Sequence, residues 1–201
     1  MKNKRLWSWL GAILLIGAAF LLLNFRLALS SMQAEKLVAT TDSGDDLPTP
    51  MQGNNQISMV LVGEGPLVRA LQKALTEQMN EAGIGEVELV QELEAAYQSP
   101  VLVVKVGKPG PIWTPLFAMS QIPVHAGYAS NGDMAFMEII EETHTSIGSP
   151  DHSVLTMYGE YEVMDRSLGL ISRPGYHQYL ADYLAQEIVT ALKDLYAAQG
   201  I

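Results

Sequence analysis

The residues of this chain whose types could support acid–base chemistry include His125 and Glu138. They lie in two alternating segments, residues 122–129 and 134–142, on either side of Ser-Asn-Gly-Asp at 130–133. Asn-Gly between two alternating segments predicts a hairpin with a two-residue turn. In that register His125 faces Glu138, and a carboxylate beside a histidine raises its pKa, as general acid–base catalysis requires. The interpretation we prefer is a cross-strand charged pair without a catalytic role.

A second group of chemically capable residues follows closely along the chain. Glu141, His144, Asp151 and His152 fall within one short stretch, and histidine and carboxylate are ligands for zinc. Their spacing matches no standard metal motif, and Gly-Ser-Pro at 148–150 indicates a loop. We therefore interpret this stretch as a solvated loop and predict no metal site.

The sequence contains no complete motif for a dinucleotide cofactor or for a catalytic nucleophile. Gly63-Glu64-Gly65 follows a predicted strand, as a dinucleotide loop would, but Val68 stands where the third glycine belongs and Glu64 would face the pyrophosphate. No serine lies in a nucleophile-elbow pattern, and the absence of cysteine excludes thiolate chemistry and disulfides. The sequence thus predicts no catalytic residue and no cofactor.

The charge of the chain is divided unevenly along its length. All 22 acidic residues lie from Glu35 onward, and the chain beyond Arg26 carries 8 basic residues, which makes a net charge of −14. An acidic body of this kind is repelled by nucleic-acid phosphates and by anionic lipid headgroups. We therefore exclude nucleic acid as a partner.

The N-terminal region contains a run of 20 uncharged residues, Leu6–Phe25. A helix of that length spans a hydrocarbon core of about 30 Å. Lys2, Lys4 and Arg5 precede the run, so the positive-inside rule keeps the N-terminus in the cytoplasm. The prediction is a single-pass signal-anchor, residues 1–29 with a short basic cytoplasmic tail, in which residues 6–25 contact membrane lipid.

The alternative is a cleaved signal peptide, which would release the rest of the chain as a secreted protein. Ala28 and Ser30 could then serve as the small residues at the cut, although signal peptides normally have shorter apolar regions. In both cases the polar segment 30–55 is predicted to be a flexible linker, and residues 56–201 an extracytoplasmic domain.

The first half of that domain has the pattern of a βαβ unit. Residues 57–62 form an apolar strand, and Leu67, Leu71, Leu75 and Met79 define one face of a helix. Strands are predicted at 87–90 and 101–106, with a short helix at 92–98 between them. The run at 101–106 is almost wholly apolar and β-branched, which is typical of a central strand covered on both faces.

The second half is predicted to be antiparallel and to end in a helix. After the hairpin we expect a strand at 154–164, a turn at 165–169 and a short return at 170–171, and the final helix begins at Pro174. The fold class is therefore α+β: a transmembrane helix followed by a small mixed-sheet domain, with its helices packed mainly on one face.

The predicted hairpin also defines two faces of the sheet. Val124, Ala126 and Tyr128 fall on the buried side. The face turned away from the helices carries a group of apolar residues that could form an interaction face: Met134, Phe136, Ile140 and Tyr158. Such residues mark a partner site, or they are covered by the proline-rich segment around Trp113.

The function that we predict from these observations is a non-enzymatic one. The domain is expected to bind or scaffold another protein of the cell envelope, as an accessory subunit of an envelope complex. The alternatives are a small-molecule binding or sensory domain and a membrane-tethered hydrolase that uses the region of His125 or His144.

Overall fold

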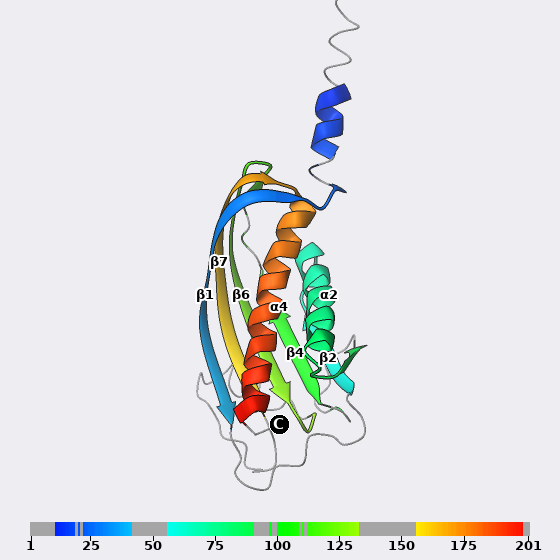
Figure 1. Cartoon of the computed structure of the whole chain (residues 1–201), viewed down its shortest axis with the longest axis vertical. Helices are drawn as coiled ribbons and strands as arrows, with labels where there is room; N and C mark the ends of the chain where they lie inside the picture. The colour runs from blue at the N-terminus through cyan, green and yellow to red at the C-terminus, as the bar shows by residue number, and fades with distance from the viewer. Residues whose placement is uncertain are drawn as a thin grey trace, which may run out of the picture.

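A computed structural model of the chain describes residues 11–18, 20, 22–41, 56–90, 97, 100–108, 110, 112–132 and 156–198. These residues form one strongly curved mixed sheet with two long helices, α2 (Pro66–Glu81) and α4 (Arg173–Ala198), side by side on one of its faces (Figure 1). The prediction of an α+β domain with its helices on one face is confirmed for this part of the chain.

The sheet has seven strands in the order β1-β7-β6-β4-β2-β3, with β5 paired to β6 beside this path. In chain order the strands are β1 (Arg26–Thr41), β2 (Gln56–Val62), β3 (Glu86–Val90), β4 (Val101–Val106), β5 (Ile112–Thr114), β6 (Phe117–Ala129) and β7 (Thr156–Ile171).

The βαβ opening forms as predicted. Strand β2 pairs in parallel with β3 on one side and with β4 on the other. Helix α2 begins at Pro66, where the missing N–H is not needed and the fixed φ suits a helix. In β4, residues 101–104 are completely buried, which confirms that this strand is covered on both faces.

Strand β7 differs from the prediction. It runs without interruption through residues 165–169, where a turn was expected, because β1 and β6 pair with it on both sides along this stretch. Gly169 is the source of the false turn signal. Its φ is +136°, and a Cβ there would lie 2.4 Å from the Leu27 carbonyl oxygen, so the glycine allows β1 to approach closely while the strand continues.

The predicted hairpin also needs a correction. Along Val124–Ala129, strand β6 is paired with β4 on one edge and with β7 on the other, so both edges of this part of the strand are already occupied. The turn signal at residues 130–132 is followed by a segment outside the described residues. The burial of Val124, Ala126 and Tyr128 is confirmed.

The main core lies between the sheet and the two helices. It joins residues of α2, α4 and the helix-facing side of the strands, and its largest fully buried members include Leu71, Met79, Tyr128, Tyr161 and Tyr176. The final helix starts within one residue of the predicted position, because Ser172 caps it: the Ser172 hydroxyl accepts a hydrogen bond from Gly175 N at 3.0 Å.

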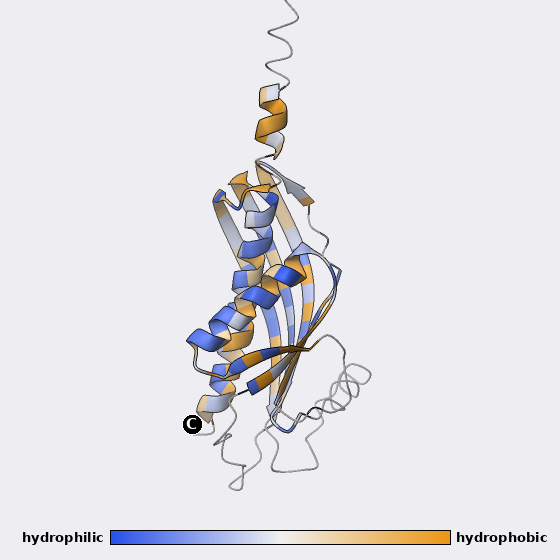
Figure 2. Cartoon of the chain, turned by 90° about the vertical axis from the view of Figure 1, so that its right-hand side faces the viewer, coloured by the Kyte–Doolittle hydropathy of each residue, from blue (hydrophilic) through white to orange (hydrophobic). Residues whose placement is uncertain are grey.

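The predicted transmembrane helix is corrected by the structure. In the described part of the chain, none of the helices has the length and apolar character that crossing a membrane needs. The described N-terminal helical residues are 11–18, 20 and 22, and the chain then turns into β1 at Arg26 (Figure 2). The single-pass and signal-anchor descriptions therefore do not hold for this structure.

The predicted linker is corrected over its first part. Residues 30–41 do not form a tether but most of β1, a strand of 16 residues that pairs with β7 along its whole length. The ordered domain therefore begins about 30 residues earlier than predicted, and β1 is one edge of the sheet.

Candidate interaction face

The two faces of the sheet follow directly from the alternation of β7. Met157, Tyr161 and Val163 point into the main core under the helices. The residues between them, such as Glu160 and Glu162, lie on the opposite side, which we call the open face. On β1 and β6 the open-face residues are those aligned with them, for example Glu35 opposite Glu162 and His125 opposite Glu160.

One end of the open face is covered. Tyr158 is only 5% exposed and belongs to a second, small apolar cluster, whose other buried members are Val60, Val101, Val103 and Ala129, with Val90 and Tyr97 packed against them. Tyr158 was predicted as an exposed contact residue, and this is wrong. Tyr158 is covered by residues of this cluster and not by the proline-rich segment around Trp113, which packs against the main core.

Next to this cluster lies a polar group centred on His125. The Tyr158 hydroxyl donates a hydrogen bond to Glu160 Oε1 at 3.1 Å and lies 3.0 Å from His125 Nδ1. Because that hydroxyl proton is already used, Nδ1 is the donor in the contact with His125. The Nδ1 atom of His125 is 4.0 Å from Glu160 Oε1.

The strand neighbours of His125 are Lys105 on β4 and Glu160 on β7. The carboxylate across the strand from it is therefore Glu160. The predicted partner, Glu138, lies outside the described residues. The hydrogen bonds of the His125 group hold three side chains of one sheet together, which supports a structural role for the histidine.

The open face continues into a row of carboxylates. Glu35 and Glu162 are opposed on β1 and β7, and Gln121 donates a hydrogen bond to Glu162 Oε1 at 2.5 Å. With Glu160 and the exposed Leu37 they line a shallow groove of about 460 Å³. We call Glu35, Glu160 and Glu162 the acidic row.

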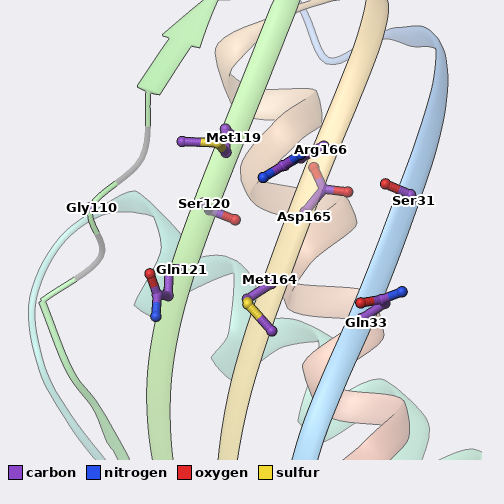
Figure 3. Close-up of a pocket in the computed structure, with 9 residues that line it drawn as sticks. All are labelled: Ser31, Gln33, Gly110, Met119, Ser120, Gln121, Met164, Asp165 and Arg166. Carbon is purple, nitrogen blue, oxygen red and sulfur yellow. The ribbon is translucent and has the colours of Figure 1, made fainter.

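Beyond the acidic row lies a groove of about 500 Å³ that we call the central groove (Figure 3). It runs over β6, β7 and β1, beside Gly110, and its other lining residues are Ser31, Gln33, Met119, Ser120, Gln121, Met164, Asp165 and Arg166. The lining residues on the open face are one serine, the amides of Gln33 and Gln121, the methionines Met119 and Met164, and one charged residue, Arg166.

The far end of the open face is apolar. Leu27 is opposed to Leu170 and Leu29 to Leu168, on the neighbouring strands β1 and β7. The exposed fraction is 73% for Leu27, 85% for Leu29, 65% for Leu168 and 43% for Leu170. These four side chains form an exposed patch. We call this patch the leucine end.

A polar network lies on the other side of the sheet, under the start of α4. Asp165 is only 1% exposed and accepts a hydrogen bond from the Ser167 hydroxyl at 2.8 Å. Burial raises the pKa of the Asp165 carboxyl above its ordinary value, against the opposing effect of the Ser167 hydrogen bond. Ser167 is in turn hydrogen-bonded to Ser30 at 2.5 Å, and Arg26 donates to Ser30.

This network fastens the first residues of β1 to the rest of the domain. The Arg26 guanidinium lies 3.5 Å from the centre of the Tyr179 ring on α4, a cation–π contact. Ser172 donates to the Phe25 carbonyl oxygen at 2.8 Å and accepts from Phe25 N at 2.9 Å. We did not predict this network, although Asp165 and Ser167 continue the core-facing phase of Val163.

Several predicted residues lie outside the described part of the chain. These are Met134, Phe136, Glu138 and Ile140, the stretch 141–152 with its histidines and carboxylates, and the helix predicted at 92–98 apart from Tyr97. Within the described residues, no group of three or more histidine and carboxylate side chains is placed to hold a metal ion.

Comparisons with known proteins give little. No protein-family model matches the chain, and no curated protein matches its sequence. Among solved structures, a point variant of the PelC dodecamer from Paraburkholderia phytofirmans is similar with a TM-score of 0.38 and 14% identity, over 79% of this chain and 97% of that one. A PelC dodecamer from the same organism has a TM-score of 0.39 and 10% identity, over 77% and 97%. Likeness at this level tells nothing about the function of this chain.

Proposed function

We propose that this protein is a non-catalytic interaction domain that binds another protein on its open sheet face. The observation that carries the proposal is the contrast between the two faces of the sheet. The helix side is closed by α2 and α4 over a continuous core, whereas among the described residues no helix or strand covers the central groove and the acidic row on the other side.

The side chains of the central groove suit a partner surface. Met119 and Met164 are partly exposed there, and methionine is adaptable because its thioether side chain is flexible and polarizable. Gln33 and Gln121 are exposed beside them and offer both donors and acceptors. A protein that lies across this groove could bury the methionines and still satisfy the amides.

The acidic row defines the chemistry of the partner at one side of the groove. Glu35 and Glu162 face each other on neighbouring strands, and like charges in this position destabilise the sheet slightly. A lysine or arginine from a partner would relieve that repulsion. We therefore expect the partner to present basic side chains to the acidic row and apolar ones to the groove.

The residues of the open face support a catalytic function less well than a binding function. His125 is the histidine of the open face, and its Nδ1 atom is engaged with Tyr158, whose hydroxyl is engaged with Glu160. We interpret these hydrogen bonds as structural. If the domain were a hydrolase based on His125, His125→Ala would abolish its activity; a folded His125→Ala protein that still binds its partner fits the interaction domain.

The proposal is tested by reversing charge on the open face and measuring capture of partners by crosslinking in the cell. Glu35→Lys together with Glu162→Lys should remove the captured partner, because the basic side chains expected on that partner would be repelled. Glu81→Lys, an exposed position at the end of α2, is the matched control and should leave capture unchanged. Equal capture by both variants would contradict binding at the open face.

Binding of a small molecule in the central groove is a second candidate, because its volume of about 500 Å³ is in the range of ligand sites. A ligand screen that raises the melting temperature of the full chain would favour it, provided that Met164→Glu removes the effect. A screen in which every hit also stabilises the Met164→Glu variant would count against it.

We also infer that the domain works outside the cytoplasm, because a basic N-terminus followed by an apolar run is typical of exported chains. The structure adds a condition. Ala28 and Ser30 lie inside β1, so removal of a signal peptide at those residues would delete the start of that strand. Mass spectrometry of the secreted protein should therefore find an N-terminus before Phe25; one beyond Ser30 would contradict this expectation.

A further inference from the structure

The leucine end brings together exposed aliphatic side chains from neighbouring segments. Besides Leu27, Leu29, Leu168 and Leu170, two further aliphatic residues of the segment beside β6 are exposed: Ile112 by 53% and Leu116 by 64%. The backbone places them close by, because Gly169 N donates to the Leu116 carbonyl oxygen at 3.0 Å. Contiguous apolar residues on a folded surface mark a contact with another apolar body.

The charges around these leucines are the reverse of those on the rest of the domain. Arg166 and Arg173 are exposed near them, and Arg26 is half-buried at the start of β1. In residues 22–34, 112–124 and 164–175, which build this end, the one carboxylate is Asp165, and it is buried. The net negative charge predicts repulsion of anionic lipid by the domain as a whole, but this end is locally cationic.

The position of the N-terminal helix adds a further observation. The strands β1 and β7 curve over the start of α4, and the helical residues 11–18, 20 and 22 lie beyond that same end of the sheet (Figure 1). Ile13, Leu14, Leu15 and Leu22 of this helix are between 62% and 78% exposed. Exposed apolar side chains of the helix and of the sheet therefore lie at the same end of the molecule.

We propose that the leucine end docks on a lipid surface, with Arg166 and Arg173 contacting anionic phosphate headgroups. Leucine side chains enter the boundary between headgroups and acyl chains because burial of apolar area is favourable there, and nearby arginines add attraction to anionic lipid. This surface adjoins the central groove, with which it shares Arg166, and does not include the acidic row. Docked in this way, the domain would turn the acidic row away from the anionic surface.

A protein partner is a weaker explanation for this end. Protein interfaces of this size surround an apolar centre with polar groups of both signs, and the accessible charges of this end are all basic. The described N-terminal helical residues at this end are also exposed and apolar, and they include Ile13, Leu14 and Leu15.

The absence of cysteine in the chain makes a direct test possible. In the full-length protein, Leu168→Cys would carry an environment-sensitive fluorophore, and Leu37→Cys the same fluorophore as a control. Leu37 is 67% exposed on the same face of the sheet but lies beside the acidic row. The labelled proteins would be mixed with phosphatidylcholine vesicles, with and without phosphatidylglycerol, whose acyl chains carry a quencher.

We expect the fluorophore at position 168 to be quenched several-fold more than the one at position 37 in vesicles that contain phosphatidylglycerol. Arg166→Glu with Arg173→Glu should remove the difference between the two vesicle types. The N-terminal helix lies at the same end of the domain and is unchanged in the Arg166→Glu, Arg173→Glu variant. This variant, rather than the comparison of the two positions, therefore separates docking of the leucine end from the affinity of the helix for lipid.

Equal quenching at the two positions, or none at either, would overturn the proposal. A fluorescence change at position 168 that needs no vesicles and disappears on dilution would overturn it in favour of contact between two copies of the chain. Neither result depends on the partner of the open face, so this proposal and the proposed function fail independently.

Discussion

At the scale of single residues, Ser172 joins the entry of β1 to the start of α4. Its hydroxyl accepts from Gly175 N at the start of α4 and donates to the Phe25 carbonyl oxygen before β1. One side chain therefore caps a helix and fixes the entry of the edge strand. The start of this helix at Pro174 was predicted from the sequence, but neither the cap nor the contact of Ser172 with a residue 147 positions away was predicted.

Ser172→Ala should therefore destabilise the domain. Loss of an N-cap costs about 1–2 kcal/mol, and the unpaired Phe25 groups add to that cost. Chemical denaturation of the full-length protein measures the change in the free energy of unfolding. Ser172→Thr, which keeps the hydroxyl, should recover most of it. A Ser172→Ala protein as stable as the wild type would show that the cap is not formed.

Asp165 provides a prediction about pH. Burial raises the pKa of its carboxyl above the ordinary 3.8, so the charged form is less stable in the folded state than in the unfolded one. Its contribution to stability is fully present below about pH 3.8 and is lost as the pH rises through the folded-state pKa.

Asp165→Asn keeps an oxygen acceptor for Ser167 but has no charge to bury. At neutral pH this variant should be at least as stable as the wild type, and its advantage should shrink as the pH falls toward 4. Denaturation curves at several pH values measure this difference. A variant that is less stable at neutral pH and recovers in acid would show that the ionised carboxylate stabilises the fold.

At the scale of elements, local patterns predicted the structure where a strand or helix has a strong apolar signature. The bounds of β4 and the start of α4 agree with the sequence pattern to within a residue, because continuous β-branched runs and an amphipathic helix are recognisable alone. The hairpin prediction was wrong in its pairing, since a turn signal says nothing about more distant strands that compete for the same edge. Strand β1 was missed because its residues mix Ser, Gln, Glu, Lys and Thr with alanines.

The candidate interaction face was also only partly predicted, because it depends on pairing between distant strands. The alternation of β7 placed Glu160 and Glu162 on the less apolar face, but the neighbours of that face come from β1, 120 residues earlier in the chain or more. The opposition of Glu35 to Glu162 and the pairing of the leucines depend on this distant register. They could not be derived from spacing within either segment.

Hydrogen exchange tests the assignment of β1 directly. Alternate amides between Arg26 and Thr40 should exchange slowly, because in an edge strand of an antiparallel pair every second N–H is bonded to the neighbour. The amides of β6, which has neighbours on both sides, are the internal reference. Uniformly fast exchange over residues 30–41 would restore the flexible linker predicted from composition.

At the scale of the whole molecule, the domain is organised along its long axis. The leucine end and the N-terminal helix lie at one end, the central groove and the acidic row follow along the open face, and the helices close the opposite face. The exposed leucines and arginines are thus separated along the sheet from the acidic row. Under the two proposals above, one surface would contact lipid while the other holds a protein partner.

The most direct measurement of the central claim is site-specific photo-crosslinking in the cell from the two faces of the domain. A photoreactive amino acid would replace Gln121 or Met164 on the open face, and Lys73 or Arg69 on the outer surface of α2. The account predicts one discrete crosslinked protein from positions 121 and 164, and none from positions 69 and 73. Crosslinks from the α2 positions, with none from the open face, would contradict it.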